Sequence, residues 1–278
     1  MRHHILLPTD FSENAWSAAI YAIKLYAKVP CTFYFSHAWT FVNTGSRTYI
    51  SPTYIDTLQN TSKEQLKALR ERAQFISPNS EHEFETIFSE DFLTESIKTA
   101  IKDHAIDTVV MGTKGATGAK EFLLGSNSVT VIKKVKLCPI LLVPNHYEFE
   151  TPEHIAFATD FNRSYGDEIL AITKLAKLQK SNLEIIHING RDDLSEGQND
   201  NLKTLSNFLK NHPHNFNWIS GKGTKKQLIS TFIEENSIHL ICMVNYEHSF
   251  LEDLLNEPII KKLGYQSQIP FMVIPHIE

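Results

Sequence analysis

The sequence repeats itself after about half of its length, and this constrains the fold more than any other feature. An apolar run that ends in Thr9-Asp10-Phe11 returns as a similar run that ends in Thr159-Asp160-Phe161. The two halves also finish alike, with a Pro followed by apolar residues 140–143 and 271–274. A spacing of about 130 to 150 residues is too long for a solenoid repeat and fits a duplicated domain. We expect two domains, residues 1–146 and 152–278, with a polar linker between them.

Each half alternates strand and helix patterns, which is typical of a doubly wound parallel sheet. In the first half we expect strands at residues 5–7, 32–36, 82–88, 107–111 and 140–143, and helices after Ser12 and at 65–75, 92–102 and 127–135. Between Trp39 and Asp56 we expect a longer connection than the second half has, most simply a surface loop. The second half otherwise repeats this order between residues 155 and 274. The predicted fold is α/β, with two tandem, Rossmann-like, parallel five-stranded sheets. A duplicated fold retains the self-complementary patch of a dimer, so we expect an intramolecular pseudodimer with the last strands near its interface.

Composition narrows the class of protein. Hydrophobic residues make up 42% of the chain and charged residues 21%, as in ordinary soluble proteins. The net charge of −5 gives no reason to expect nucleic acid as a partner. We expect neither a secretion signal nor a membrane span, because no apolar run is long enough. Three widely spaced cysteines disfavour a disulfide framework or a clustered metal site. We therefore expect a cytoplasmic protein with reduced thiols.

A glycine pattern follows the fourth predicted strand of the first half. Gly112 and Gly115 are separated by two residues, nine residues follow, and Gly125-Ser126 then stands at a predicted helix start. Glycines let the backbone approach an anion, and free amides at a helix start attract negative charge. Nearby serine hydroxyls and Lys114 can add hydrogen bonds to phosphate. The pattern predicts a phosphate site, and the plainer alternative is that these glycines only make turns.

Two further positions fit a nucleotide at the same edge of the predicted sheet. Asp10, at the end of the first strand, can accept a hydrogen bond from a ribose hydroxyl. The backbone of Ala38, after the second strand, can meet the edge of an adenine ring.

With these residues in place, the first half resembles a universal stress protein domain of the ATP-binding subclass. The resemblance rests on the glycine pattern, on Pro8-Thr9-Asp10 and on the closing run from Cys138 to Pro144; as a tandem pair it covers essentially the whole chain. It implies a role in stress response and bound ATP or AMP, with or without Mg²⁺. It implies a nucleotide site made of Pro8, Thr9, Asp10, Ala38, Met111, Gly112, Lys114, Gly115, Gly125, Ser126, Asn127 and Ser128. A homodimer of the pseudodimer stays open.

The second half departs from the pattern. Val244-Asn245-Tyr246-Glu247 stand where the first two glycines belong, and Asn256-Glu257 align with Gly125-Ser126. Side chains replace the glycines, and Glu257 adds a charge that repels phosphate. We expect this half to have lost the phosphate site.

Other motifs are weaker. Residues 220–226 contain two glycines and three lysines but lack Walker A spacing, so we expect an exposed loop there. His212 and His214 flank a Pro in what we expect to be a solvated turn rather than a metal site. No nucleophile has an evident base. A nucleotide-sensing regulatory protein is therefore the leading hypothesis; slow ATP hydrolysis and a binding module for another small ligand are the alternatives.

Overall fold

The computed structural model describes residues 1–40, 51–113, 125–246 and 269–276. The described chain divides into two compact units, one formed by residues up to Cys138 and the other by residues from Pro139 onward. None of the described helices combines the length and the hydropathy needed to cross a lipid bilayer.

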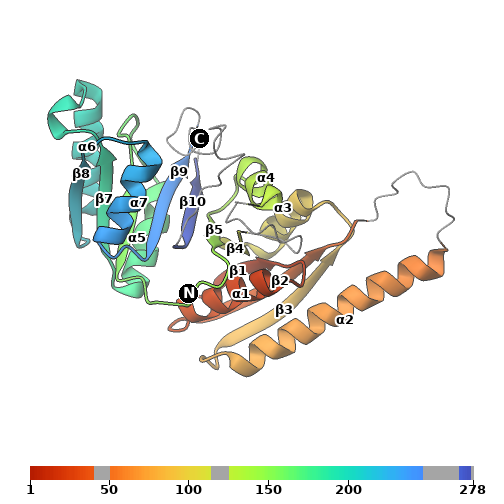
Figure 1. Ribbon diagram of the computed structural model, residues 1–278. Coiled ribbons are helices and arrows are strands. Elements are labelled where there is room, and N and C mark those ends of the chain that lie inside the picture. Colours follow the sequence, from red (N-terminus) through yellow and green to blue (C-terminus); the bar gives the residue numbers. More distant parts are fainter. Residues whose placement is uncertain (41–50, 114–124, 247–268, 277–278) are drawn as a thin grey trace. The chain divides into compact units, whose positions relative to one another are not determined.

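The first unit is built on four parallel strands in the order β3-β2-β1-β4 (Figure 1). The strands are β1 (His3–Pro8), β2 (Cys31–Ala38), β3 (His82–Ser89) and β4 (Thr108–Gly112), and the helices are α1 (Glu13–Leu25), α2 (Pro52–Ile76), α3 (Leu93–His104) and α4 (Ser126–Lys134). The chain runs outward from β1 to β3 and then returns to β4 on the other side of β1. The connection direction therefore reverses between β1 and β4, which is where open parallel sheets bind ligands.

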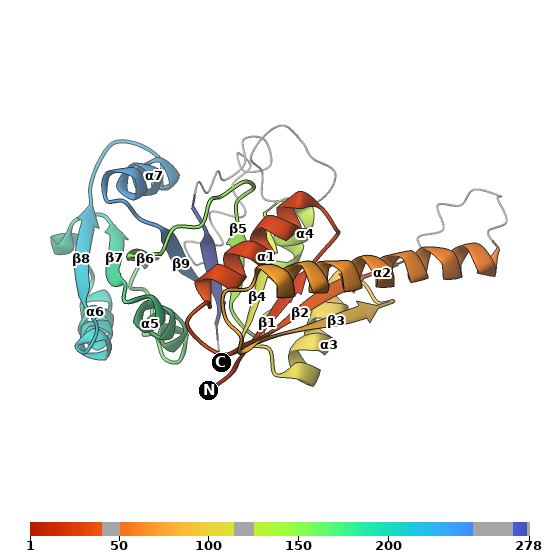
Figure 2. The ribbon, with the colours of Figure 1, turned by 90° about the horizontal axis from the view of Figure 1, so that it is seen from below.

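The second unit has the strand order β5-β10-β9-β6-β7-β8 (Figure 2). Its strands are β5 (Ile140–Val143), β6 (His154–Ala158), β7 (Asn182–Ile188), β8 (His214–Ile219), β9 (Leu240–Asn245) and β10 (Phe271–Pro275), and its helices are α5 (Glu168–Gln179), α6 (Glu196–Leu209) and α7 (Lys225–Glu235), with a short 3₁₀ turn, η1 (Arg191–Asp193). β5 pairs antiparallel with β10, so the last strands of the two repeats join within this unit. The strand pairs β10–β9, β9–β6, β6–β7 and β7–β8 are parallel.

The central strands β1 and β4 each carry a continuous buried apolar run. In β1, Ile5 and Leu6 are fully buried, and Val109 of β4 is equally inaccessible. Such continuous apolar runs are expected when helices cover both faces of a parallel sheet. The predicted α/β alternation is confirmed, and the elements for which the first half gave ranges begin and end within two residues of the predicted bounds, apart from the start of α2.

α2 corrects one sequence expectation. The helix begins at Pro52, whereas the sequence predicted a connection as far as residue 56 and a helix only from residue 65. The hydroxyl of Ser51 accepts a hydrogen bond from the Tyr54 amide at 3.2 Å and caps the helix, and Pro52 stands at its first position. The remainder of the predicted connection, residues 41–50, lies outside the described residues. The buried residues of α2 are Ser62, Leu66 and Ala73, and none of them lies in its first two turns. The start of the helix therefore shows only weak apolar periodicity in the sequence.

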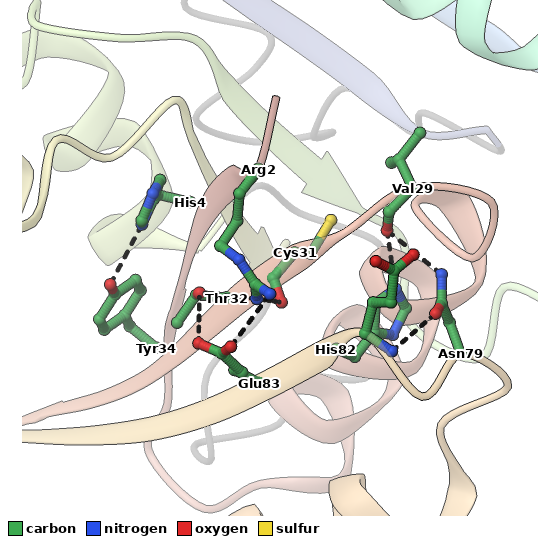
Figure 3. Close-up of polar contacts among 10 residues, drawn as sticks. Arg2, His4, Val29, Cys31, Thr32, Tyr34, Asn79, His82 and Glu83 are labelled. Atoms are coloured by element: carbon green, nitrogen blue, oxygen red, sulfur yellow. Dashed lines mark hydrogen bonds and ion pairs between the residues drawn. The ribbon is translucent and has the colours of Figure 1, made fainter.

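The amino ends of β2 and β3 are tied by polar contacts (Figure 3). The guanidinium of Arg2 lies 3.0 Å from a carboxylate oxygen of Glu83 and donates to the Cys31 carbonyl at 3.1 Å. Next to them, Nε2 of the buried His82 lies 3.2 Å from the carbonyl oxygens of Tyr26 and Val29. These contacts stabilise the amino ends of the strands, and the predicted ligand site lies at the opposite, carboxyl ends.

Candidate functional site

The turn after β1 holds Asp10 in place. The Phe11 amide donates to the Thr9 hydroxyl at 3.0 Å, and the Ser12 amide and hydroxyl donate to Asp10 Oδ1 at 3.1 and 2.5 Å. Phe11 has a φ of +64°, which is uncommon for a side chain of this size. These local hydrogen bonds stabilise that conformation. Ser12 also caps α1 by accepting from the Ala15 amide, so the carboxylate is fixed between a strand end and a helix start.

His37 supports the same turn from the end of β2. Its Nδ1 lies 2.8 Å from the Thr9 carbonyl oxygen, and its ring is 4.5 Å from that of Phe11. The second unit repeats both contacts, because Nδ1 of His187 lies 2.9 Å from the Thr159 carbonyl oxygen and its ring is 5.1 Å from Phe161. The sequence analysis did not include His37 in the site. Its recurrence at the end of the second strand in both halves was the signal that could have identified it.

Gly112 ends β4 against α1. A Cβ at this position would lie 2.4 Å from Nδ2 and 2.7 Å from Cγ of Asn14, so only glycine fits this approach. The buried hydroxyl of Ser128 donates to the Gly112 carbonyl at 3.1 Å and thereby links β4 to α4. This hydroxyl, which the sequence assigned to phosphate, therefore has a bond within the protein.

α4 begins directly after Gly125. The Gly125 amide donates to the Thr113 carbonyl at 2.5 Å, and no described side chain caps the helix. Ser126 and Asn127 are exposed in its first turn. A helix start that has exposed residues and lacks a side-chain cap is suited to accept an anion.

A cavity of about 130 Å³ lies at the switch point between β1 and β4. Of the twelve predicted site residues, those that line it are Pro8, Thr9, Asp10, Ala38, Met111, Gly112, Asn127 and Ser128. Gly125 and Ser126 begin α4 outside this lining, and Lys114 and Gly115 lie outside the described residues. Ala15, His37 and Leu93 complete the lining and were not predicted. The structure therefore brings most of the predicted residues together around one small cavity.

In the second unit the corresponding carboxylate has a different partner. Asp160 accepts from the Asn162 amide at 3.0 Å, as Asp10 does from Ser12, but its Oδ1 also accepts from the Tyr246 hydroxyl at 2.5 Å. Burial and the nearby Tyr165 phenol and Asp160 carboxylate raise the pKa of Tyr246 above its usual range. The phenol therefore keeps its proton and donates a hydrogen bond to Asp160. When the sequences are aligned on the paired residues of β1 with β4 and of β6 with β9, Tyr246 corresponds to Lys114, which lies outside the described residues.

A cluster of charged and polar side chains lies beside Tyr246. Arg163 Nη2 lies 2.9 Å from Oε1 of the buried Glu168, and Nδ1 of His276 lies 3.0 Å from the same oxygen. Burial alone would raise the pKa of Glu168, but the hydrogen bonds from His276 and the Gly166 amide, together with Arg163, bring it below the ordinary value. The guanidinium of Arg163 also lies 5.3 Å from the centre of the Tyr246 ring. Glu247, Asn256 and Glu257 lie outside the described residues.

The weaker motifs can also be located. Residues 220–224 form an exposed connection before α7, as predicted, and Lys225 begins that helix. His214 begins β8, and its Nδ1 lies 2.9 Å from the carbonyl oxygen of His212 in the turn before that strand. In the parts of the chain that the structure describes, no three His, Cys, Asp or Glu side chains gather closely enough to hold a metal ion.

Comparison with known proteins agrees with this fold. Residues 1–144 match the universal stress protein family. Universal stress protein YxiE of Bacillus subtilis is 27% identical over 138 residues, which are 49% of this chain and 92% of that protein. A universal stress protein from Archaeoglobus fulgidus superimposes with a TM-score of 0.72 and 19% identity over 98% of both chains. A protein of unknown function from Pseudomonas aeruginosa gives a TM-score of 0.55 and 14% identity, over 98% of this chain and 92% of its own. The chain belongs to the universal stress protein family.

Proposed function

We propose that the first unit binds an adenine nucleotide, ATP or AMP, and that the protein acts as a nucleotide-responsive regulator in stress response. The observation that carries this proposal is the convergence of eight predicted nucleotide residues on the cavity between β1 and β4. In this arrangement Asp10 accepts from a ribose hydroxyl, and the adenine ring lies among Ala38, Leu93 and Met111. The phosphates extend toward the start of α4, with or without a bound Mg²⁺.

The cavity of about 130 Å³ is smaller than a typical site for a whole nucleotide. This volume suits the base and part of the ribose, so the phosphates would lie beyond it. Exposed Ser126 and Asn127 stand in that direction, at the uncapped start of α4.

A regulatory role fits the side chains better than catalysis. Hydrolysis of ATP needs a group that positions or deprotonates water and, commonly, a metal site. Asp10 is the cavity's carboxylate, and it already accepts two hydrogen bonds from Ser12. We propose that bound nucleotide changes the protein's stability or its affinity for a partner.

Two measurements test the proposal. Mass spectrometry of the small molecules released from purified protein should identify ATP or AMP, and calorimetric titration should give one site per chain. Gly115→Val should abolish binding, because a side chain there obstructs the approach of phosphate. Absence of binding for both nucleotides would contradict the proposal. Labelled ATP should stay intact over a single-turnover experiment, and rapid phosphate release that depends on Asp10 would instead support the hydrolase alternative.

A further inference from the structure

The second unit has a larger cavity than the first, with a volume of about 430 Å³, and it shares the strand-end positions of the first cavity but extends from the common carboxylate in a different direction. In the first unit the cavity includes Met111 and Gly112 of β4 and Ser128 of α4. In the second unit it starts at Asp160 and runs past the end of β7 to Gly221 and Lys225, beyond β8. None of its lining residues comes from the described part of β9. The cavity therefore extends away from the side on which the first unit would hold phosphate.

Tyr246 accounts for this change of direction. Tyr246 follows β9, and its hydroxyl donates a hydrogen bond to Asp160. The phenol therefore lies on the side of the carboxylate that faces β9. The side toward β7 and β8 stays open, because Thr159, Asp160 and His187 all line the cavity there. A ligand in the second unit would extend from Asp160 toward α7.

The far end of the cavity differs in charge from its counterpart in the first unit. Leu93, the first residue of α3, lines the first cavity, whereas Lys225, the first residue of α7, lines the second. The connection before the helix changes from Glu90-Asp91 to Gly221-Lys222-Gly223. At the cavity itself, an apolar residue is thus replaced by a cation, and the acidic residues that precede it in the first unit are missing from the connection, which favours an anionic group.

The two glycines let the backbone itself line this end. A Cβ on Gly221 would lie 2.9 Å from the Leu228 side chain. Gly223 has a φ of +148° and lines the cavity together with Gly221. Backbone without side chains can approach an anion closely.

The near end of the cavity is suited to hydroxyl groups. The carboxylate of Asp160 lines it together with Asn162 and Asn189. Asp193, which also lines the cavity, accepts from the Gly190 amide at 3.0 Å, and this bond partly offsets its charge. β6, β7 and β8 are adjacent, so Asp160 and Gly221 are separated by two strand spacings, or about 10 Å. This span matches a phosphorylated sugar.

We propose that the second unit binds a small phosphorylated polyol, such as a sugar phosphate, in this cavity. Its phosphate lies against Gly221, Gly223 and Lys225, and its hydroxyls bond to Asp160 and the neighbouring asparagines. The volume of about 430 Å³ falls within the range of small-molecule sites. This proposal does not rest on nucleotide binding in the first unit, because every residue it uses belongs to the second.

Ribose 5-phosphate is a suitable probe, with ribose and inorganic phosphate as its two fragments. Titration of the full-length protein, followed by calorimetry and by the NMR shifts of the Gly221 and Gly223 amides, should show binding of ribose 5-phosphate. Lys225→Gln should raise its Kd about tenfold, because a charge-assisted contact to phosphate is lost. Asp160→Asn should also weaken binding. Lys222→Gln is the matched control: Lys222 is exposed in the same connection but does not line the cavity, so the Kd should stay unchanged.

Three results would overturn the proposal. They are no binding of ribose 5-phosphate at millimolar concentration, equal affinity in Lys225→Gln and in the parent protein, and loss of binding in Gly115→Val. The last result would place the probe in the first unit. Conversely, loss of nucleotide binding in Gly115→Val with ribose 5-phosphate binding intact would separate the two sites.

Discussion

The hydroxyl of Tyr246 donates a hydrogen bond of 2.5 Å to Oδ1 of Asp160. One oxygen of the carboxylate that corresponds to Asp10 thus already accepts from a side chain at the end of β9. In the first unit, Asp10 Oδ1 accepts from the Ser12 hydroxyl within its own turn. The two repeats therefore share a strand-end carboxylate but surround it differently. This difference motivates the asymmetry that we expect in ligand binding.

Replacing Tyr246 tests this asymmetry. Tyr246→Phe removes a donor to a charged acceptor and should lower the free energy of unfolding by about 1.5 to 3 kcal/mol, measured by urea denaturation. It should not create a second nucleotide site, because Val244 and Glu247 still replace the glycines. Tyr54→Phe is a suitable control, since Tyr54 is 55% exposed on α2 and its loss should change stability little. Calorimetry that showed two equivalent nucleotide sites in either protein would contradict the expected asymmetry.

A second prediction concerns the close approach of β4 to α1. Gly112→Ala places a methyl group 2.4 Å from Asn14 Nδ2 and 3.0 Å from the Asn14 carbonyl oxygen, so backbone or side chain must shift. We expect the variant to lose about 1 to 3 kcal/mol of unfolding free energy and to bind nucleotide more weakly. Gly197→Ala is the control, because Gly197 lies in α6 with nothing within 4 Å of the added carbon. It should stabilise the protein by about 0.4 to 1 kcal/mol. Equal stability of the two variants would mean that Asn14 moves aside freely.

The sequence predicted the elements whose signal is local. Strand β5 was predicted at its observed bounds, because its apolar run is short and stands directly after a Pro. The start of α2 was missed, because Ser51-Pro52 opens a helix whose first turns are polar and exposed. Apolar periodicity cannot detect such a helix, whereas its capping residues could have indicated it.

The candidate site was predicted to a similar extent. The residues of the family pattern that the structure describes surround the first cavity or begin α4, because strand ends and helix starts fix their positions. The cavity of the second unit was not foreseen, and residues 220–226 were interpreted only as an exposed loop. Its location depends on the direction of the Tyr246 side chain and on the proximity of Gly221 to Asp160 across two strands. Neither relationship can be derived from sequence spacing.

A third prediction concerns stability against pH. Burial lowers the pKa of His82, although the carbonyls of Tyr26 and Val29 partly oppose the shift. Between this lowered pKa and the unfolded value of about 6.5, the unfolded chain binds more protons than the folded protein. The stabilising effect of the neutral imidazole is therefore complete above about pH 6.5 and is lost as the pH falls through the folded pKa.

Thermal unfolding between about pH 7.5 and pH 5.5 measures this effect. The melting temperature should fall toward the acid end, and His82→Gln should make that fall shallower, because glutamine does not titrate. His212→Gln, which replaces a half-buried histidine in the second unit, is the matched control for the loss of a histidine side chain. A His82→Gln protein with an unchanged acid slope would show that another group causes it.

The two serines of α4 should differ in what they contribute, although the family pattern assigns both to phosphate. The Ser128 hydroxyl is buried and donates to the Gly112 carbonyl, whereas Ser126 is exposed in the first turn of the helix. Ser128→Ala should therefore lower the unfolding free energy by about 0.5 to 1.5 kcal/mol and change nucleotide affinity less. Ser126→Ala should leave stability nearly unchanged and weaken nucleotide binding by a similar amount. Urea denaturation and calorimetric titration of both variants separate the two effects. If Ser126→Ala binds ATP and AMP as tightly as the parent protein, its hydroxyl does not contact phosphate, and the backbone amides at the start of α4 must supply the contacts instead.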